Sequence, residues 1–459
     1  MKWSKRIGIV IIIVAIALLP GCQAAIVEQY MVDAAITRTT TDNNNISNDE
    51  SMPEQTHKDE ANMSDKPSVK PTTVEEAQVE TTIINESMSW QEFVKDMGMG
   101  WNLGNTFDAS DCTWVSNDLE YEGAWLPDHS KTTKEMILLV KEQGFRTIRI
   151  PISWHNHVDL STDEQGNKIY IIRKEWMDRI KEVVDYCYEE DLYVILNIHH
   201  DNSREFIYPT QDCKEQSLNY LTQIWTQIAT VFAEYDLHVI YEVMNEVRLV
   251  GTGDEWNPNS LNSQKAQGII NEYAQEAVNS IRAVDRGYNR ERFILCSGYA
   301  AALDSYPSYI LPTDPGGVSN RIIVSVHAYT PYSFCMDTSQ GQHVYDAQVQ
   351  AAVQDVFRVI DKQWTSKDIP VVIGEWGAIM REDNATQRQQ YAQEYVKMAT
   401  TACQDSSGNT VQIPCILWDN ANVETHKGET FGVLDRKNMT WVDKAYVDMI
   451  IGTWKQEQP

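Results

Sequence analysis

The sequence predicts an α/β protein whose main part is a (β/α)8 barrel of the TIM type, preceded by a lipoprotein signal peptide and a disordered linker. Two observations predict the barrel. Eight short, largely apolar segments alternate with longer segments of helical period over roughly 370 residues, a size that suits this fold with long loops. In addition, polar and aromatic residues gather at the carboxyl-terminal ends of the apolar segments, where barrels of this kind place their active sites.

Residues 1–22 have the features of an export signal. Basic residues at positions 2, 5 and 6 precede the apolar run 7–19, which is too short to span a bilayer comfortably. The run ends in LPGC, which resembles the lipobox of bacterial lipoproteins and predicts that Cys22 is lipidated and becomes the mature N-terminus. We therefore expect a lipoprotein at the bacterial cell surface, in contact with the membrane only through this anchor. Pro20 is unusual within the motif, so secretion with cleavage elsewhere is the alternative.

Residues 23–86 are predicted to be a disordered linker. The stretches TRTTTDNNNISNDE and DKPSVKPTTVEE are rich in Thr, Asn, Ser, Pro and acidic residues and have no sustained apolar period. Such a segment buries too little apolar surface to offset the conformational entropy lost on ordering. We expect it to hold the domain that follows, residues 87–457, away from the cell surface.

Charge and cysteine content narrow the class of protein. A formal net charge of −28 argues against a nucleic-acid partner, because phosphate binding needs clustered Lys and Arg, and it suits an exported protein that acts on a neutral polymer. Besides Cys22 there are seven cysteines, whose odd number and lack of a CxxC spacing indicate neither a complete disulfide framework nor a zinc site. The pairing of individual cysteines stays open. We expect a monomer without a cofactor.

The eight predicted strands are nearly continuous in apolar character, as in a parallel sheet covered by helices. They are MGWNLGN (Met99 to Asn105), TIRIPIS (Thr147 to Ser153), LYVILNIHH (Leu192 to His200), VIYEVMNE (Val239 to Glu246), FILCSGY (Phe293 to Tyr299), IIVSVHAY (Ile322 to Tyr329), PVVIGEWG (Pro370 to Gly377) and CILWDN (Cys415 to Asn420).

Helical segments lie between these strands. KTTKEMILLVKEQG is predicted to be a helix with Gly144 as its C-cap, and SLNYLTQIWTQIATVFAEY has apolar residues at helical spacing. A doubly wound sheet is the alternative architecture, but no glycine-rich phosphate loop follows the first strand. The alternation therefore favours eight βα units closed into a barrel.

Almost every predicted strand ends in polar or aromatic residues. In VIYEVMNEV the apolar run gives way to Asn245 and Glu246, although burying an unpaired carboxylate is costly. The ends of the other strands carry Arg149, His199 and His200, His327 and Tyr329, Glu375 and Trp376, and Trp418, Asp419 and Asn420. Any one of these has a structural explanation, such as a satisfied buried histidine, but six strands together indicate one shared site.

Glu246 and Glu375 end the fourth and seventh predicted strands and would face each other across the barrel mouth. Two opposed carboxyl groups are typical of acid/base or covalent chemistry on an acetal, and retaining glycosidases hold such a pair about 5 Å apart. Arg149 and Tyr329 can hydrogen-bond to Glu375 and keep it ionised. The negative charge would then favour a protonated Glu246, as a general acid requires.

Seven motifs, in order along the chain, carry a resemblance to a known family. They are GWNLGNTFDA, RIPISW, NIHHD, MNE, VHAYTPYSF, IGEWGA and ILWDN. Together they resemble glycoside hydrolase family 5, and most closely its bacterial subfamily 4 of endo-β-glucanases, over essentially the whole chain after the linker. The resemblance implies a retaining, endo-acting enzyme that cleaves β-1,4-glucosidic bonds in cellulose-type, mixed-linkage glucan or xyloglucan polysaccharides.

The resemblance also implies roles for individual residues. The Asn-Glu pair of the fourth strand makes Glu246 the acid/base, and the Glu of the Gly-Glu-aromatic-Gly motif makes Glu375 the nucleophile. The remaining family positions fall on the supporting residues Arg149, His199, Asn245, His327, Tyr329 and Trp418, with His200 as a further sugar contact. Two positions depart from the family pattern: Val247 replaces the usual proline, and Trp376 stands where another aromatic residue is commoner. Neither removes a reacting group, so they concern loop shape and substrate preference.

Aromatic and acidic residues outside the reacting pair are expected to bind the polymer. Trp101, Trp125 and Trp418 are predicted platforms for glucosyl units, and Asn245 is suited to holding a sugar hydroxyl. The loops 108–125 and 199–213 are expected to line outer sugar subsites, although a merely solvated loop is an equally good interpretation of any single residue there.

Three other functions fit part of the pattern. An endo-β-1,4-mannanase would share the fold and the two glutamates and differ only in its contacts to the sugar 2-hydroxyl. A non-catalytic polysaccharide-binding barrel would normally have lost one of the glutamates, and both are present. A metal hydrolase would use His199, His200 and Asp201, but adjacent residues of a strand point to opposite faces and rarely share one metal.

Overall fold

The computed structural model describes residues 88–339, 341–425 and 428–457. Its centre is a closed barrel of eight parallel strands, which follow one another around the ring in chain order. The strands are β1 (Gly100–Asn102), β2 (Thr147–Ile150), β5 (Tyr193–Asn197), β6 (Val239–Glu242), β7 (Ile294–Ala302), β8 (Ile322–His327), β9 (Val371–Trp376) and β12 (Cys415–Leu417). The eight predicted strands are confirmed. All except β7 end one to four residues sooner than predicted, so most of the polar strand-end residues stand in loops above the barrel.

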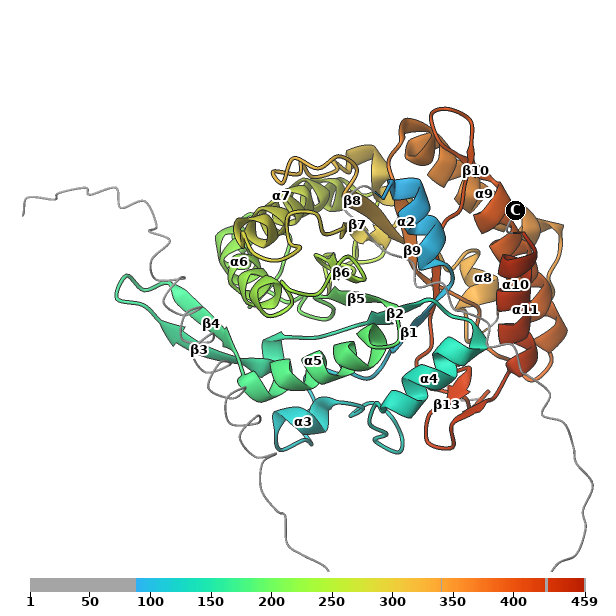
Figure 1. Ribbon diagram of the computed structural model, residues 1–459, viewed down its shortest axis with the longest axis horizontal. Coiled ribbons are helices and arrows are strands. Elements are labelled where there is room, and N and C mark those ends of the chain that lie inside the picture. The colour runs from blue at the N-terminus through green and yellow to red at the C-terminus, as the bar shows by residue number, and fades with distance from the viewer. Residues whose placement is uncertain (1–87, 340, 426–427, 458–459) are drawn as a thin grey trace, which may run out of the picture. The chain divides into compact units, whose positions relative to one another are not determined.

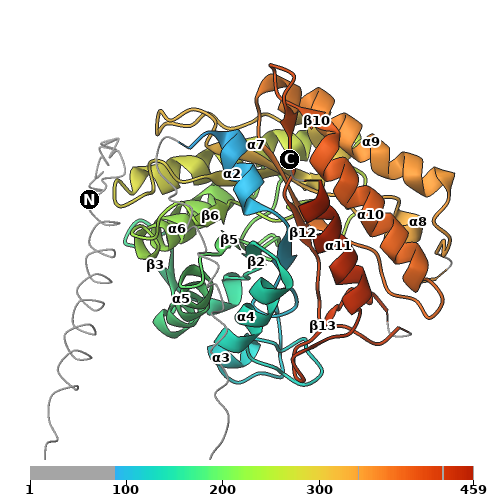
Figure 2. The same ribbon diagram turned by 45° about the vertical axis from the view of Figure 1, so that its right-hand side comes forward.

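Helices surround the barrel on its outside, as Figures 1 and 2 show. They are α4 (Lys134–Gln143), α5 (Lys174–Tyr188), α6 (Lys214–Val231), α7 (Leu261–Ala283), α9 (Ala347–Gln363), α10 (Ala385–Thr401) and α11 (Lys444–Gln456). The prediction of eight βα units is wrong at one point, because the β7–β8 connection holds only the 3-10 helix η2 (Leu303–Ser308). That connection contains three prolines and two glycines within residues 307–317, which oppose a continuous helix.

Local sequence signals set the ends of the helices. The hydroxyl of Thr133 accepts a hydrogen bond from the Met136 amide and begins α4. Gly144 ends α4 with a φ of 114°, a left-handed conformation that glycine adopts without strain, and its amide donates to the Lys141 carbonyl. The predicted C-cap is therefore confirmed.

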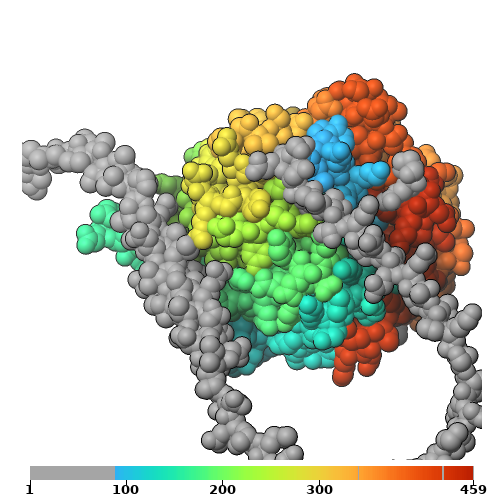
Figure 3. Space-filling model, in the orientation of Figure 1, coloured from blue at the N-terminus to red at the C-terminus, as the bar shows by residue number. Residues whose placement is uncertain are grey.

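The amino-terminal end of the barrel is closed by α2 (Trp90–Met97). A capping box between Ser89 and Glu92 begins this helix. Phe93 on its buried face stacks on Phe293, which precedes β7, and makes an edge contact with Tyr193 at the start of β5. Figure 3 shows α2 on the face seen in Figure 1. The helix α2 therefore packs against the amino-terminal ends of β5 and β7.

Shorter elements decorate the loops. They are the strand pairs β3 (Val158–Thr162) with β4 (Lys168–Ile172), β10 (Cys403–Gln404) with β11 (Thr410–Val411) and β13 (Leu434–Asp435) with β14 (Thr440–Trp441), the helices α3 (Asp118–Tyr121) and α8 (Tyr332–Cys335), and the 3-10 helices η1 (His155–His157) and η3 (Thr365–Lys367).

The predicted signal peptide, Cys22 and the predicted linker lie outside the described residues. Within the described part of the chain, none of the helices is long and apolar enough to cross a membrane. The seven cysteines in that part are all buried, and all are free thiols in the structure.

Candidate active site

A buried arginine organises the floor of the site at the carboxyl-terminal end of the barrel. Arg149 on β2 is fully buried. Its Nη1 lies 2.9 Å from both Asn102 Oδ1 and Glu375 Oε1, and its Nη2 lies 2.7 Å from Asn245 Oδ1. Its Nε and Nη2 lie 2.8 and 2.7 Å from Glu242 Oε2. Because these partners come from β1, β9, and the end of β6, one side chain fixes the relative positions of four strands.

The two glutamates predicted for catalysis face each other above this floor. One carboxyl oxygen of Glu246, one of Glu375 and a ring nitrogen of His327 all lie within 4.8 Å of one another. His327 Nδ1 is 2.6 Å from Glu246 Oε1 and 3.6 Å from Glu375 Oε2. The Tyr329 hydroxyl donates to Glu375 Oε2 at 2.9 Å. The prediction that Arg149 and Tyr329 hydrogen-bond to Glu375 is therefore confirmed.

The pKa values of the two glutamates are shifted in opposite directions. Burial raises the pKa of Glu375 above its ordinary value, although the positive charges of His327 and Arg149 oppose this. Burial also acts to raise the pKa of Glu246, but the hydrogen bond and charge of His327 and the charge of Arg248 outweigh it, so this pKa is lowered. The expected directions were the reverse. The sequence did not reveal that His327 sits against Glu246 and so stabilises its ionised form.

His199 is held as a neutral hydrogen-bond donor. The Asn197 amide oxygen accepts from the Ile152 N–H at 2.9 Å, which turns the amide nitrogen toward His199 Nδ1, also at 2.9 Å. Nδ1 therefore accepts, and the ring proton is on Nε2. Burial lowers the pKa of His199 well below its usual value, so the ring is uncharged at neutral pH. His199 can donate a hydrogen bond to a neutral ligand such as a sugar hydroxyl.

Two of the three predicted aromatic platforms, Trp418 and Trp125, lie beside His199 and His200. The Trp418 ring is parallel to the His199 ring within 2°, and Trp125 lies 5.4 Å from the His200 ring. Gly104 allows the position of Trp418, because a Cβ atom at Gly104 would come within 2.8 Å of the indole ring. The structure therefore brings Trp125, Trp418, His199 and His200 together on one side of the site.

The third predicted platform, Trp101, is wrong. Trp101 is fully buried, and its indole N–H donates to Asp419 Oδ2 at 3.0 Å. It neighbours Asn102 on β1, whose side chain reaches Arg149 inside the barrel, and successive side chains of a strand point to opposite sides. Trp101 thus belongs to the packing around the barrel.

The prediction that His199 and His200 point to opposite faces of a strand is also wrong. Their ring centres lie 4.4 Å apart, and donor atoms of Asp108, His199 and His200 lie within 4.8 Å of one another. Strand alternation does not apply to them because β5 already ends at Asn197. The positions of these atoms are therefore compatible with a bound metal ion, and the enzymatic rate after removal of metal ions tests for one.

Trp376, one of the two departures from the family pattern, faces away from the site. Its ring stacks on Tyr395 of α10, with ring centres 4.4 Å apart and planes 12° from parallel. It is fully buried between barrel and helices. This departure therefore changes packing and not the surface that a ligand would meet.

The acidic loop 108–125 is held by ion pairs with α5 and the residue that precedes it. Asp118 pairs with Arg173, and Glu122 pairs with Arg179. Both carboxylates are buried, so neither is available to a sugar. Within this loop Trp114 and Trp125 remain exposed. Trp114 and Trp125, together with the exposed carboxylates of Asp111 and Glu120, are therefore among the side chains of this loop that solvent reaches.

Four residues that shape the site were not predicted from the sequence. Glu242, Asn102 and Asn197 form the buried polar layer with Arg149, and Arg248 Nη1 lies 3.8 Å from Glu246 Oε2. A signal was present for Glu242, since it is the charged residue within the otherwise apolar part of β6. No comparable signal marked the two asparagines.

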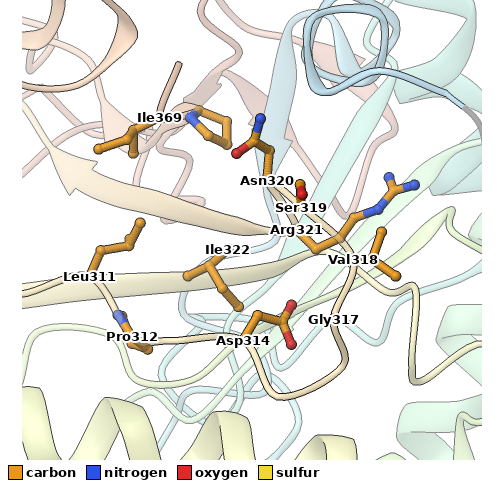
Figure 4. A pocket seen from close by; sticks show the side chains of 11 residues that line it. Leu311, Pro312, Asp314, Gly317, Val318, Ser319, Asn320, Arg321, Ile322 and Ile369 are labelled. Atoms are coloured by element: carbon orange, nitrogen blue, oxygen red, sulfur yellow. The ribbon is translucent and has the colours of Figure 1, made fainter. Parts of the chain in front are cut away.

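A separate cavity of about 300 Å³ opens at the other end of the barrel. It is lined by Leu311, Pro312, Asp314 and residues 317–322, and by Ile369 and Pro370, which precede β8 and β9 or begin β8 (Figure 4). Its carboxylate, Asp314, is paired with Arg282. Because the two glutamates lie at the carboxyl-terminal ends of β6 and β9, at the other end of the barrel, this cavity takes no part in their chemistry.

The fold and the two opposed glutamates define a class of protein, a barrel hydrolase that acts on glycosidic bonds with a pair of carboxyl groups. Residues 107–424 match the family model described as cellulase, glycosyl hydrolase family 5. The chain belongs to glycoside hydrolase family 5 and is a glycoside hydrolase of the endoglucanase type.

Curated relatives and solved structures agree with this family. The chain is 38% identical to endoglucanase B of Ruminococcus albus over 82% of this chain and 84% of the relative. A family 5 lichenase from a Caldicellulosiruptor species, solved with cellotetraose, is 38% identical, with a TM-score of 0.73 over 80% of this chain and 95% of that one. A broad-specificity endoglucanase of family 5 subfamily 4 from Ruminococcus champanellensis, solved with cellotriose, is 37% identical, with a TM-score of 0.71 over 81% and 100%.

Proposed function

We propose that this protein is a retaining endo-β-1,4-glucanase in which Glu375 is the nucleophile and Glu246 is the acid/base. The separation of the two glutamates carries the proposal, because an oxygen of each lies within 4.8 Å of the other. Retaining enzymes hold their carboxyl groups about 5–5.5 Å apart, whereas inverting enzymes need about 6.5–9.5 Å to admit a water molecule. The shorter spacing supports attack by a carboxylate on the sugar itself.

The contacts of Glu375 suit a nucleophile. Arg149 and Tyr329 each donate to one of its two oxygens, so they orient the carboxylate and favour its ionised form. The amide oxygen of Asn245 accepts a hydrogen bond from Arg149. The amide nitrogen of Asn245 is therefore left to donate to a hydroxyl of the attacked sugar. The hydrogen bond from Asn245 to the sugar hydroxyl strengthens as positive charge builds on the sugar, and it therefore stabilises the transition state.

The pair of His327 and Glu246 supplies the proton that the leaving group needs. At 2.6 Å the two groups share one proton, which Glu246 delivers to the glycosidic oxygen as the bond to the leaving group breaks. Glu246 is then ionised and accepts a proton from the water that attacks the glycosyl-enzyme. The pair thus acts first as acid and then as base.

The proposed substrates are soluble β-glucans of the cellulose, mixed-linkage or xyloglucan type. The relatives solved with cellotetraose and cellotriose support this substrate class, and Trp418, Trp125 and the neutral His199 offer an apolar face and a hydrogen-bond donor. Attack inside the chain should lower the viscosity of carboxymethylcellulose much faster than reducing ends appear. Faster hydrolysis of mannan than of barley glucan, carboxymethylcellulose and xyloglucan at matched concentrations would favour a mannanase instead.

The mechanism is tested by the anomer that forms first. NMR of a cello-oligosaccharide digest should show the β-anomer before mutarotation, and the α-anomer would contradict a retaining mechanism. Glu375→Ala should abolish hydrolysis. Glu246→Ala should slow it, and azide should restore turnover and yield a β-glycosyl azide, because a small anion needs no general base.

We also propose that the protein is displayed at the cell surface through lipid on Cys22. The basic residues, the apolar run and the LPGC sequence support this. Cys22→Ala should release the protein into the medium or leave it unprocessed. Recovery of the wild type from the medium without lipid would leave secretion as the correct interpretation.

A further inference from the structure

The loop after β6 carries an exposed tryptophan stacked on an arginine that also touches Glu246. Trp256 is 64% exposed, and the Arg248 guanidinium lies 3.9 Å from the centre of its ring. The same guanidinium donates to the Glu246 backbone oxygen at 3.0 Å and approaches its carboxylate at 3.8 Å. Glu255 accepts from Arg248 Nε at 3.2 Å and from the Gly251 amide at 2.8 Å. Arg248 is therefore fixed from three sides and holds Trp256 in one orientation.

The position of this loop places it on the leaving-group side of Glu246. Around the ring, β6 is four strands from β12, so the loop after β6 stands across the barrel from Trp418. Trp418 follows β12, which neighbours the strand of Glu375, and both belong to the side that holds the attacked sugar. Glu246 lies between the two sides. The sugar that departs with the proton from Glu246 must therefore extend toward Trp256.

The chemistry of Trp256 suits a sugar. One face of its indole is covered by the guanidinium, while the side chain remains largely exposed. A guanidinium on one face of an indole is a favourable cation–π contact that restricts the rotation of both groups. The uncovered face is an apolar surface of fixed orientation, onto which a pyranose can place its C–H groups.

We propose that Trp256 is the binding platform for the leaving-group sugar and that Arg248 positions Glu246 beside that sugar. The inference rests on the proposed roles of Glu375 and Glu246. Trp256 would determine how strongly the rate depends on a sugar at the leaving-group position. It also links that position to the proposed acid/base through one side chain.

The platform is tested with two substrates that differ in the leaving group. In cellotetraose the leaving group is a sugar, whereas in β-cellobiosyl fluoride it is a fluoride ion that needs no platform. Trp256→Ala should lower kcat/KM for cellotetraose by about tenfold to a hundredfold, as expected for loss of one aromatic contact with the bound sugar, and should leave kcat/KM for the fluoride within about twofold. Trp256→Phe should retain much of the activity. Tyr288→Ala removes an exposed aromatic ring near the amino-terminal ends of the strands and should change neither rate.

Arg248 is tested by the pH profile. Arg248→Met removes a positive charge 3.8 Å from Glu246, so the alkaline limb of kcat/KM for cellotetraose should move to higher pH by about one unit, and Arg248→Lys should move it less. Loss of rate without movement of the limb would show a structural role and overturn the positioning claim. Equal losses on both substrates in Trp256→Ala, or no loss on cellotetraose, would overturn the platform. If the wild type hydrolyses neither substrate, the proposed function itself fails.

Discussion

Replacing Glu242 with leucine should lower the free energy of unfolding by about 3–5 kcal/mol, the usual cost of removing one partner from a buried ion pair. Glu242 is fully buried and has three polar partners. Its Oε2 accepts from Arg149 and, at 3.1 Å, from the Asn197 amide, and its Oε1 accepts from the Ser325 hydroxyl at 2.7 Å. Leucine would leave Arg149 with one carboxylate neighbour, Glu375, and would leave the other two partners without this acceptor.

The measurement is urea unfolding followed by tryptophan fluorescence, with the slope compared between variants so that a change in midpoint reports stability. Ser325→Ala is the matched control, because it removes one hydrogen bond to the same carboxylate and should cost only about 1.5–3 kcal/mol. Activity on carboxymethylcellulose should fall in Glu242→Leu even where the protein is folded. Arg149 would no longer be fixed from below, and its orientation toward Glu375 would loosen.

The strength of the buried ion pair between Arg149 and Glu242 is tested by replacing both residues. When both members of a buried ion pair are replaced by apolar residues, the penalty for an unpaired charge disappears. Arg149→Met with Glu242→Leu should therefore be more stable than the sum of the two single losses predicts. A Glu242→Leu protein that loses less than about 1 kcal/mol, or a strictly additive double variant, would show that the pair does not have the assumed strength.

Three further predictions follow from the same geometry. His327→Gln should move both limbs of the pH profile of kcat/KM to higher pH, because the His327 charge lowers the pKa of both glutamates. The acidic limb reports ionisation of the nucleophile, and the alkaline limb reports loss of the proton from the acid. An unmoved profile would contradict a proton shared between His327 and Glu246. Trp418→Ala should lower kcat as well as raise KM for cello-oligosaccharides, by about tenfold or more in kcat, since its ring supports the sugar that distorts in the transition state; a change in KM alone would restrict it to uniform binding. Dialysis against a chelator should leave the rate on barley glucan unchanged within about twofold, and a loss restored by zinc would show that activity depends on a metal held by one of the two clusters, Asp108 with His199 and His200 or Glu246 with His327 and Glu375.

The sequence predicted the barrel and most of the site because both depend on local pattern. Apolar runs that alternate with helical segments predicted all eight strands, which the structure confirms. The polar strand ends predicted that Arg149 and Tyr329 contact Glu375 in a site shared with Glu246, which the structure also confirms. What failed depended on the exact end of a strand or on contacts across the barrel. His199 and His200 lie together because β5 ends sooner than predicted.

Side-chain direction and long-range pairing account for the remaining errors. Trp101 was predicted to be a platform because it is an aromatic residue suited to stacking on a glucosyl unit, but the alternation along β1 turns it outward. The pKa directions of the glutamates depend on the 2.6 Å contact between His327 and Glu246, which joins residues far apart in the sequence. A strand-end pattern tells which residues gather, and not which of them touch.

The charges of the site favour a proton held between His327 and Glu246, as the proposed mechanism requires. Three carboxylates, of Glu242, Glu246 and Glu375, face the permanent positive charges of Arg149 and Arg248. One further proton makes this set neutral, and His327 lies within 3.6 Å of both Glu246 and Glu375, where its ring can carry that proton. In the proposed mechanism that proton leaves with the sugar as Glu375 loses its negative charge by forming a bond to the anomeric carbon. The net charge of the buried set is therefore the same before and after the step, so the low-dielectric interior is never left with an uncompensated charge.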